Sequence, residues 1–237
     1  MASNKDKAKQ AAKRDERRRR QRAGEAGDGP TLGEVVAAHQ LVGKTSHATR
    51  STITRAEEFI RDKARVNLSV VACDTCTAPK GCCWNRTSAW MYEGIPIANR
   101  LRAEGRDTPE LRQALQTAAA LMEGPAEYRR PCVFLDQDER CTIYADRPAV
   151  CGTAFVSSDP AQCSATGGRI NKHVHPFLPT TATAQDLFNQ EAGMPPLERG
   201  YLARLPRVVL LCLQAWDRRD YAAFISGRLA EIAATAP

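Results

Sequence analysis

The cysteines constrain this chain more than any other feature, because seven of them fall into two spaced groups. The first group reads Cys73-x2-Cys76-x5-Cys82-Cys83, and the second reads Cys132-x8-Cys141-x9-Cys151. Two thiolates separated by two residues can bind one metal, since the intervening turn brings both sulfurs to one point. We therefore expect folding to gather both groups around a zinc ion or an iron–sulfur cluster.

The N-terminal sequence and the overall hydropathy favour a cytoplasmic location. The first residues lack the apolar stretch of a secretory signal, and they include Asp6, Asp15 and Glu16, which transit peptides avoid. No run approaches the roughly 18 apolar residues of a membrane helix, so no membrane partner is expected. Thiols stay reduced in the cytoplasm, where dense cysteines indicate metal or redox chemistry rather than disulfides.

The positive charge is concentrated at the N-terminus. Residues 1–22 contain ten Lys/Arg and three Asp/Glu, whereas the rest of the chain is balanced. Residues 1–30 also contain almost no large apolar side chain, which predicts a disordered basic arm. The block Arg17–Arg20 could contact nucleic acid or another acidic partner. The alternative is a solvated tail that aids solubility.

Residues 31–237 are expected to form a single helical domain that contains the cysteine motif at about 70–156. The fold class predicted is mainly α, with an irregular cysteine-rich metal-binding centre and little or no β-sheet. Apolar residues recur at helical spacing in two segments, residues 31–66 and the C-terminal part. The first stripe comprises Ile53, Ala56, Phe59, Ile60 and Ala64, and the second comprises Tyr221, Phe224, Ile225, Leu229 and Ile232.

Helix-capping and helix-breaking residues predict where the remaining helices begin and end. A helix is expected over residues 87–104, broken near Gly94 and Pro96. A second helix starts with Thr108 as its cap and Pro109 at its first position, and stops at Gly124. Its buried face should comprise Leu111, Leu115, Ala118 and Met122. Residues 67–72 look extended, residues 133–135 and 142–144 could form two small strands, and residues 157–182 look like a loop.

The cysteine region resembles the CxxCxxCC cysteine-cluster family, the YkgJ-like zinc- or iron-chelating domains. The resemblance rests on the first cysteine group, on a helix-like run that begins at Glu93, and on the segment Cys132-Val133-Phe134-Leu135. Its most distinctive part is Cys141-Thr142-Ile143-Tyr144 followed by Arg147-Pro148-Ala149-Val150-Cys151. The resemblance implies metal binding, but it fixes neither the metal nor a reaction.

Two departures from the family pattern are visible. The family usually spaces its third cysteine closer than Cys82 lies to Cys76, so a longer loop is expected here. It also usually has arginine after the last cysteine, where this chain has Gly152.

The number of thiols does not decide whether the chain holds one metal centre or two. One zinc ion or one [4Fe–4S] cluster needs four ligands, so either three of the seven cysteines are surplus or two centres exist. Cys163 would be an eighth thiol and would complete two sets of four. His173 and His175 could complete a site with fewer thiols, or they could be polar loop residues. Cys212 lies in an apolar run and is expected in the core.

Three functions remain open on the sequence alone. The first is a metal-binding protein, which either stores metal or is structured by it. The second is an iron–sulfur redox protein or enzyme component, and the third is a nucleic-acid-associated protein that uses the basic arm. No nucleophile–base pattern, phosphate loop or pair of catalytic carboxylates stands out, so the sequence does not establish an enzyme.

Overall fold

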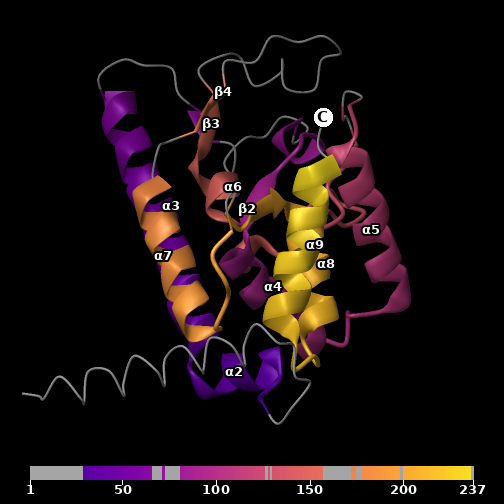
Figure 1. Cartoon of the computed structure of the whole chain (residues 1–237). Helices are drawn as coiled ribbons and strands as arrows, with labels where there is room; N and C mark the ends of the chain where they lie inside the picture. Colours follow the sequence, from indigo (N-terminus) through magenta and orange to yellow (C-terminus); the bar gives the residue numbers. More distant parts are fainter. Residues whose placement is uncertain are drawn as a thin grey trace, which may run out of the picture.

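The computed structural model describes residues 29–65, 71–72, 81–125, 128, 130–156, 172–174, 178–197 and 200–235. Most of these residues are helical, and the strands are short, which confirms the predicted fold class (Figure 1). Residues 1–28 of the predicted basic arm lie outside the described residues. The helices are α2 Leu32–Ala38, α3 Leu41–Arg65, α4 Met91–Ala103, α5 Pro109–Glu123, α6 Ala149–Thr153, α7 Leu178–Glu191, α8 Leu205–Ala215 and α9 Tyr221–Thr235.

Two small antiparallel sheets and two short 3-10 helices accompany these helices. The first sheet has the order β1–β3–β4, and the second pairs β2 with β5. Their bounds are β1 Val71–Ala72, β2 Ser88–Trp90, β3 Ala154–Val156, β4 Lys172–Val174 and β5 Leu202–Arg204. The 3-10 helices are η1 Gly81–Trp84 and η2 Tyr144–Asp146. Among the described residues, sheet structure is therefore confined to short pairings around the helices.

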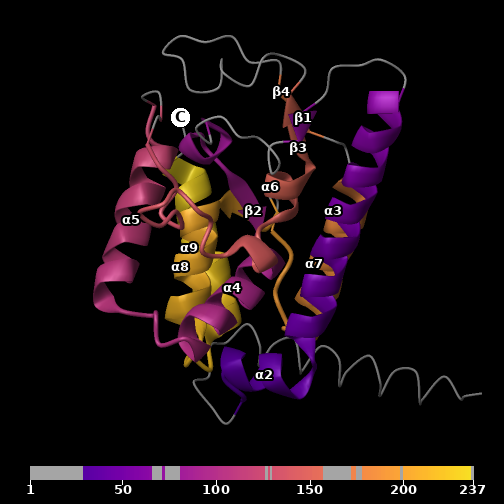
Figure 2. The ribbon, with the colours of Figure 1, turned by 180° about the vertical axis from the view of Figure 1, so that it is seen from behind.

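Helices α4 and α8 form the centre of the molecule. Nine of the 13 residues of α4 and nine of the 11 residues of α8 are buried, as expected of helices that are covered on most sides. Helix α5 and helix α9 pack on α8, whereas α3 and α7 lie beside α4 (Figures 1 and 2). The core therefore forms between segments that are more than a hundred residues apart in the chain.

Helix α4 does not break at Gly94 or Pro96, so this prediction was wrong. The helix runs unbroken from Met91 to Ala103. A proline inside a helix costs about 3 kcal/mol, because it lacks an N–H and crowds the preceding turn. Burial of large apolar side chains such as Ile95 and Ile97 offsets this cost at about 1.5–3 kcal/mol each. Packing on both sides of α4 thus outweighs its local preference.

Gly94 allows α4 and α8 to approach closely. A Cβ atom at this position would lie 2.7 Å from Cγ1 of Val208 and 2.8 Å from Sγ of Cys212. Both atoms belong to buried residues of α8, so neither side chain can move into solvent. The absence of a side chain at Gly94 is therefore a requirement of the packing between the two helices.

We expect Gly94→Ala to lower the free energy of unfolding by about 1–3 kcal/mol, because the added methyl group overpacks the contact with Val208. Urea unfolding measures this change. The matched control is Gly227→Ala in α9, where nothing lies within 4 Å of the added Cβ. This control should gain roughly 0.5–1 kcal/mol from helix propensity alone. A gain of stability in Gly94→Ala as well would contradict the close contact.

The other helix signals are largely confirmed. The segment predicted over residues 31–66 forms α2 and α3, which are separated at Gln40, a residue with a φ of 50°. In α5, the Thr108 side chain accepts a hydrogen bond from the Leu111 N–H, and Gly124 is the C-cap. Ala119 rather than Ala118 is buried in this helix. In the other stripes, the described members Ile53, Tyr221, Ile225 and Leu229 are buried, whereas Phe224 and Ile232 are half-buried.

The two strands predicted at residues 133–135 and 142–144 are absent, and only a single bridge joins Leu135 to Cys141. A side chain closes the turn between them, because Asp136 Oδ1 accepts hydrogen bonds from the N–H groups of Asp138 and Arg140. Glu139 has a φ of 57°, which no extended strand has. The chain therefore makes a compact loop instead of a hairpin.

The prediction of a loop over residues 157–182 was wrong in part. Strand β4 lies within it and pairs with β3, with His173 opposite Phe155. Helix α7 already begins at Leu178. Residues 157–171 and 175–177, including His175, lie outside the described residues.

Candidate metal centre

The two cysteine groups meet at a main-chain hydrogen bond. The N–H of Cys132 donates to the carbonyl oxygen of Cys83 at 2.7 Å. Cys83 belongs to η1, and 48 residues lie between the two cysteines in the chain. Both side chains are half-buried. The fold thus places the main chain at the end of the first group next to the start of the second group.

The compact loop between Cys132 and Cys141 holds these two residues near each other. The N–H of Leu135 donates to the Cys132 carbonyl at 3.0 Å, and Leu135 bridges to Cys141. The carbonyl of Phe134, whose side chain is buried, accepts the N–H of Thr142 at 2.8 Å. Cys132 and Cys141 both pack against the hydrophobic core at half-buried positions. The loop is therefore anchored in the core at its base, near both cysteines, whereas residues 136–140 at its tip are exposed.

Cys151 lies in the short helix α6, which packs against α3. The contact is close at Gly152, where a Cβ atom would lie 2.6–2.7 Å from three carbons of Ile53. Ile53 therefore fills the space that a side chain after the last cysteine would need. The contact therefore excludes a side chain such as arginine directly after Cys151.

Helix α4 anchors the segment from Cys141 to Cys151 at three points. Arg106, three residues beyond its end, donates to Thr142 Oγ1 at 2.9 Å. Arg100 forms an ion pair with Asp146 at 2.7 Å. Glu93 Oε1 accepts the Ala149 N–H at 2.7 Å. The segment consequently runs antiparallel to α4, and the helix sets the places of both cysteines.

Sequence reasoning missed the position of Glu93, which lies buried between α4 and α6. Its side chain is 2% exposed, and its second oxygen accepts the Trp90 N–H at 2.8 Å. Burial raises the pKa of this carboxyl to about 7, although the two main-chain hydrogen bonds act in the opposite direction. The signal was a glutamate at the third position of a helix, as in a capping box. It was obscured because tryptophan occupies the cap position, where serine or threonine is usual.

Charged and aromatic side chains lie close to the cysteines in the sequence. The Arg147 guanidinium lies 4.0 Å from the centre of the Tyr144 ring, and Arg147 is itself buried. Burial, and secondarily the charge of Cys132, raises the pKa of Tyr128. Arg140 is largely exposed. Of these two cations, only Arg147 is buried.

The candidate ligands are only partly placed. Cys73, Cys76 and Cys163 lie outside the described residues, as does the side chain of Cys82. Within the described part of the chain, no three Cys, His, Asp or Glu side chains gather closely enough to hold a metal ion. Cys212 is fully buried, as predicted for a core cysteine, and its thiol faces the Met91 carbonyl at 3.8 Å.

Comparison with known proteins adds one match. Residues 72–172 match the CxxCxxCC family model, whose description is "Putative zinc- or iron-chelating domain". The match begins one residue before Cys73 and includes all eight candidate cysteines. The CxxCxxCC region thus extends from β1 to β4 and contains α4, α5 and α6. No curated protein and no solved structure matches the chain.

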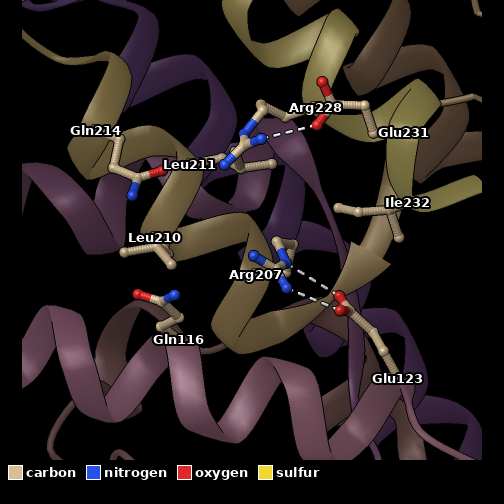
Figure 3. A pocket seen from close by; sticks show the side chains of 9 residues that line it. All are labelled: Gln116, Glu123, Arg207, Leu210, Leu211, Gln214, Arg228, Glu231 and Ile232. Atoms are coloured by element: carbon tan, nitrogen blue, oxygen red, sulfur yellow. Dashed lines mark hydrogen bonds and ion pairs between the residues drawn. The ribbon is translucent and has the colours of Figure 1, made fainter. Parts of the chain in front are cut away.

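The described residues also form a surface hollow of about 310 Å³ between α5, α8 and α9. Its charged groups are paired with one another, as Arg207 binds Glu123 through two hydrogen bonds and Arg228 binds Glu231 (Figure 3).

No helix of the described chain combines the length and the apolar character that crossing a membrane requires.

Proposed function

We propose that this protein binds zinc or an iron–sulfur cluster through thiolates drawn from both cysteine groups. The candidate ligands are Cys73, Cys76, Cys82, Cys83, Cys132, Cys141, Cys151 and Cys163. The observation that carries the proposal is the hydrogen bond between Cys132 and Cys83, which joins the two groups directly. The match of residues 72–172 to a chelating-domain family supports it.

The chemistry of the donors limits the choice of metal. Thiolates are soft ligands, which bind zinc, iron–sulfur clusters or Cu(I) in preference to hard ions such as Mg²⁺. Half-buried positions at Cys83, Cys132, Cys141 and Cys151 suit ligands that must both exclude bulk water and admit a metal. Such a centre needs reduced thiols, which agrees with a cytoplasmic location. Zinc would be structural or stored, whereas a cluster would make the protein a redox protein or an enzyme component.

We expect anaerobically purified protein to contain zinc or iron, and Cys132→Ser to lose most of it, because the hydroxyl is a poor ligand for soft metals. Elemental analysis and the absorption spectrum make the measurement. A brown protein that dithionite bleaches would identify a cluster, and a colourless protein with zinc would identify a zinc site.

The control for this experiment is Cys212→Ala, which removes a thiol from the core rather than from the cysteine groups. It should retain the metal of the wild type. Equal metal content in Cys132→Ser and in the wild type would contradict the proposal. A folded Cys132→Ser protein without metal would favour a carrier, whereas an unfolded one would favour a structural site.

A partner for the basic arm is a separate proposal. Residues 1–22 would bind nucleic acid or an acidic surface through charge, so binding should weaken steeply with salt and disappear when the arm is deleted.

A further inference from the structure

The anchor points along α4 differ in how they hold the cysteine segment. Arg106 and Arg100 bind side chains of Thr142 and Asp146, and the Arg100 side chain is one-third exposed. Glu93 instead accepts a main-chain N–H, that of the first residue of α6. A main-chain contact fixes the path of the backbone itself, whereas a contact between two side chains leaves it more freedom.

The Glu93 carboxyl connects three elements. One oxygen holds the start of α6, two residues before Cys151, and the other oxygen holds Trp90 at the end of β2. β2 is paired with β5, so the carboxyl is fixed to a sheet and to a helix that are both packed in the core. A buried carboxyl is costly to retain, because it must be desolvated. Leucine or methionine would fill this space without that cost, but neither could hold α6.

We propose that Glu93 is a positioning residue of the metal centre, which sets the place of Cys151 by holding the first N–H group of α6. This inference rests on the proposed function and deepens it. It assigns Cys151 a dependence on Glu93 that Cys83 and Cys132 do not share, since these two are joined to each other through their own main chains. Hydrogen-bond partners of this kind usually change metal affinity by about 10–100-fold when they are removed.

The test compares Glu93→Gln with the wild type, using Zn²⁺ as the probe on full-length protein freed of metal under reducing conditions. The glutamine amide has the shape of the carboxylate, but its NH₂ group would face one of the two N–H donors. Affinity is measured by competition with a coloured chelator. Accessibility of each cysteine is measured by alkylation with iodoacetamide and peptide mass spectrometry, with and without Zn²⁺.

We expect Zn²⁺ affinity to fall about 10–100-fold in Glu93→Gln, with Cys151 losing its protection from alkylation before Cys83 and Cys132 do. The matched control is Thr108→Ala, which removes the cap of α5 but touches no cysteine segment. It should bind Zn²⁺ as the wild type does. A merely destabilising effect of Glu93→Gln would expose all three cysteines together.

A second variant keeps the inference testable if the Glu93→Gln protein does not fold. Ala149→Pro removes the N–H that Glu93 accepts, and proline is favoured at the first position of a helix. It should release Cys151 in the same way. Protection of Cys151 that equals the wild type in both variants would overturn the inference and leave the proposed function standing. If Zn²⁺ protects no cysteine of the wild type from alkylation, both the inference and the proposed function are overturned for zinc.

Discussion

Gly152→Arg is expected to lower the free energy of unfolding by more than about 4 kcal/mol, the range reached when a substitution overpacks a core and also buries a charge. The reason is the contact between α6 and α3. A Cβ atom at position 152 would already lie within 2.7 Å of three carbons of Ile53, and a long cation would have to follow it into the same space. Ile53 is stiff about its Cα–Cβ bond and buried, so it cannot turn away cheaply.

This expectation is specific because the family that the cysteine region resembles usually has arginine at this position. If the contact with Ile53 were absent, arginine should be tolerated at this position. Guanidinium-induced unfolding gives the measurement. An unfolding midpoint equal to that of the wild type would show that α6 does not pack on α3 in this way.

A double-mutant cycle isolates the contact from other effects of the substitution. Gly152→Ala should cost about 1–3 kcal/mol, and Ile53→Ala should cost about 2–5 kcal/mol. The two changes should be less harmful together than their sum, since the smaller side chain makes room for the new methyl group. We expect a coupling energy of about 0.5–3 kcal/mol. Strict additivity would contradict the packing.

The second large effect is a dependence of stability on pH that originates at Glu93. Burial raises the pKa of this carboxyl from 4.5 to about 7 in the folded protein. Between these two values the folded state binds more protons at this group than the unfolded state does, so the free energy of unfolding falls as the pH rises. The contribution of Glu93 is therefore complete below pH 4.5 and is lost as the pH passes about 7, with a total of about 3 kcal/mol.

Glu93→Gln should remove this contribution, because an amide does not titrate. The measurement is urea unfolding of the variant and of the wild type at a series of pH values from 5 to 8, and the quantity compared is the difference in slope. Glu231→Gln, at an exposed position of α9, is the matched control and should keep the wild-type slope. Parallel curves for the wild type and Glu93→Gln would show that the buried carboxyl does not hold its proton in this way.

Much of the fold could be predicted from local signals. Thr108, Pro109 and Gly124 bound α5 as their cap chemistry indicates, and the apolar spacing of the C-terminal segment gives the buried face of α9. These signals succeed because each depends on neighbours within one or two turns of the chain. The cysteine spacing likewise indicated a chelating domain, and residues 72–172 match a family model of that description.

The remaining features depend on contacts between distant segments, which no local pattern encodes. Gly94 and Pro96 read as helix breakers, but α8 packs closely on Gly94 and the helix runs unbroken through both residues. Glu93 reads as an ordinary helical glutamate, and only the folded chain places Ala149 against it. Residues 133–135 read as a strand, but the Asp136 side chain closes the loop before a ladder can form. In each case, packing or a side-chain hydrogen bond outweighed the local conformational preference of the residues.

The pairing of central helix α4 with α8 has a consequence for the order of events during synthesis. Ribosomes release residues 81–151 well before residues 202–215, which supply β5 and α8. For that interval the nascent thiols are present while α4 lacks the neighbour that covers its apolar side. The apolar side of α4 is therefore covered only after residues 202–215 have been made, and under the proposed function any metal bound earlier would bind an incompletely folded chain.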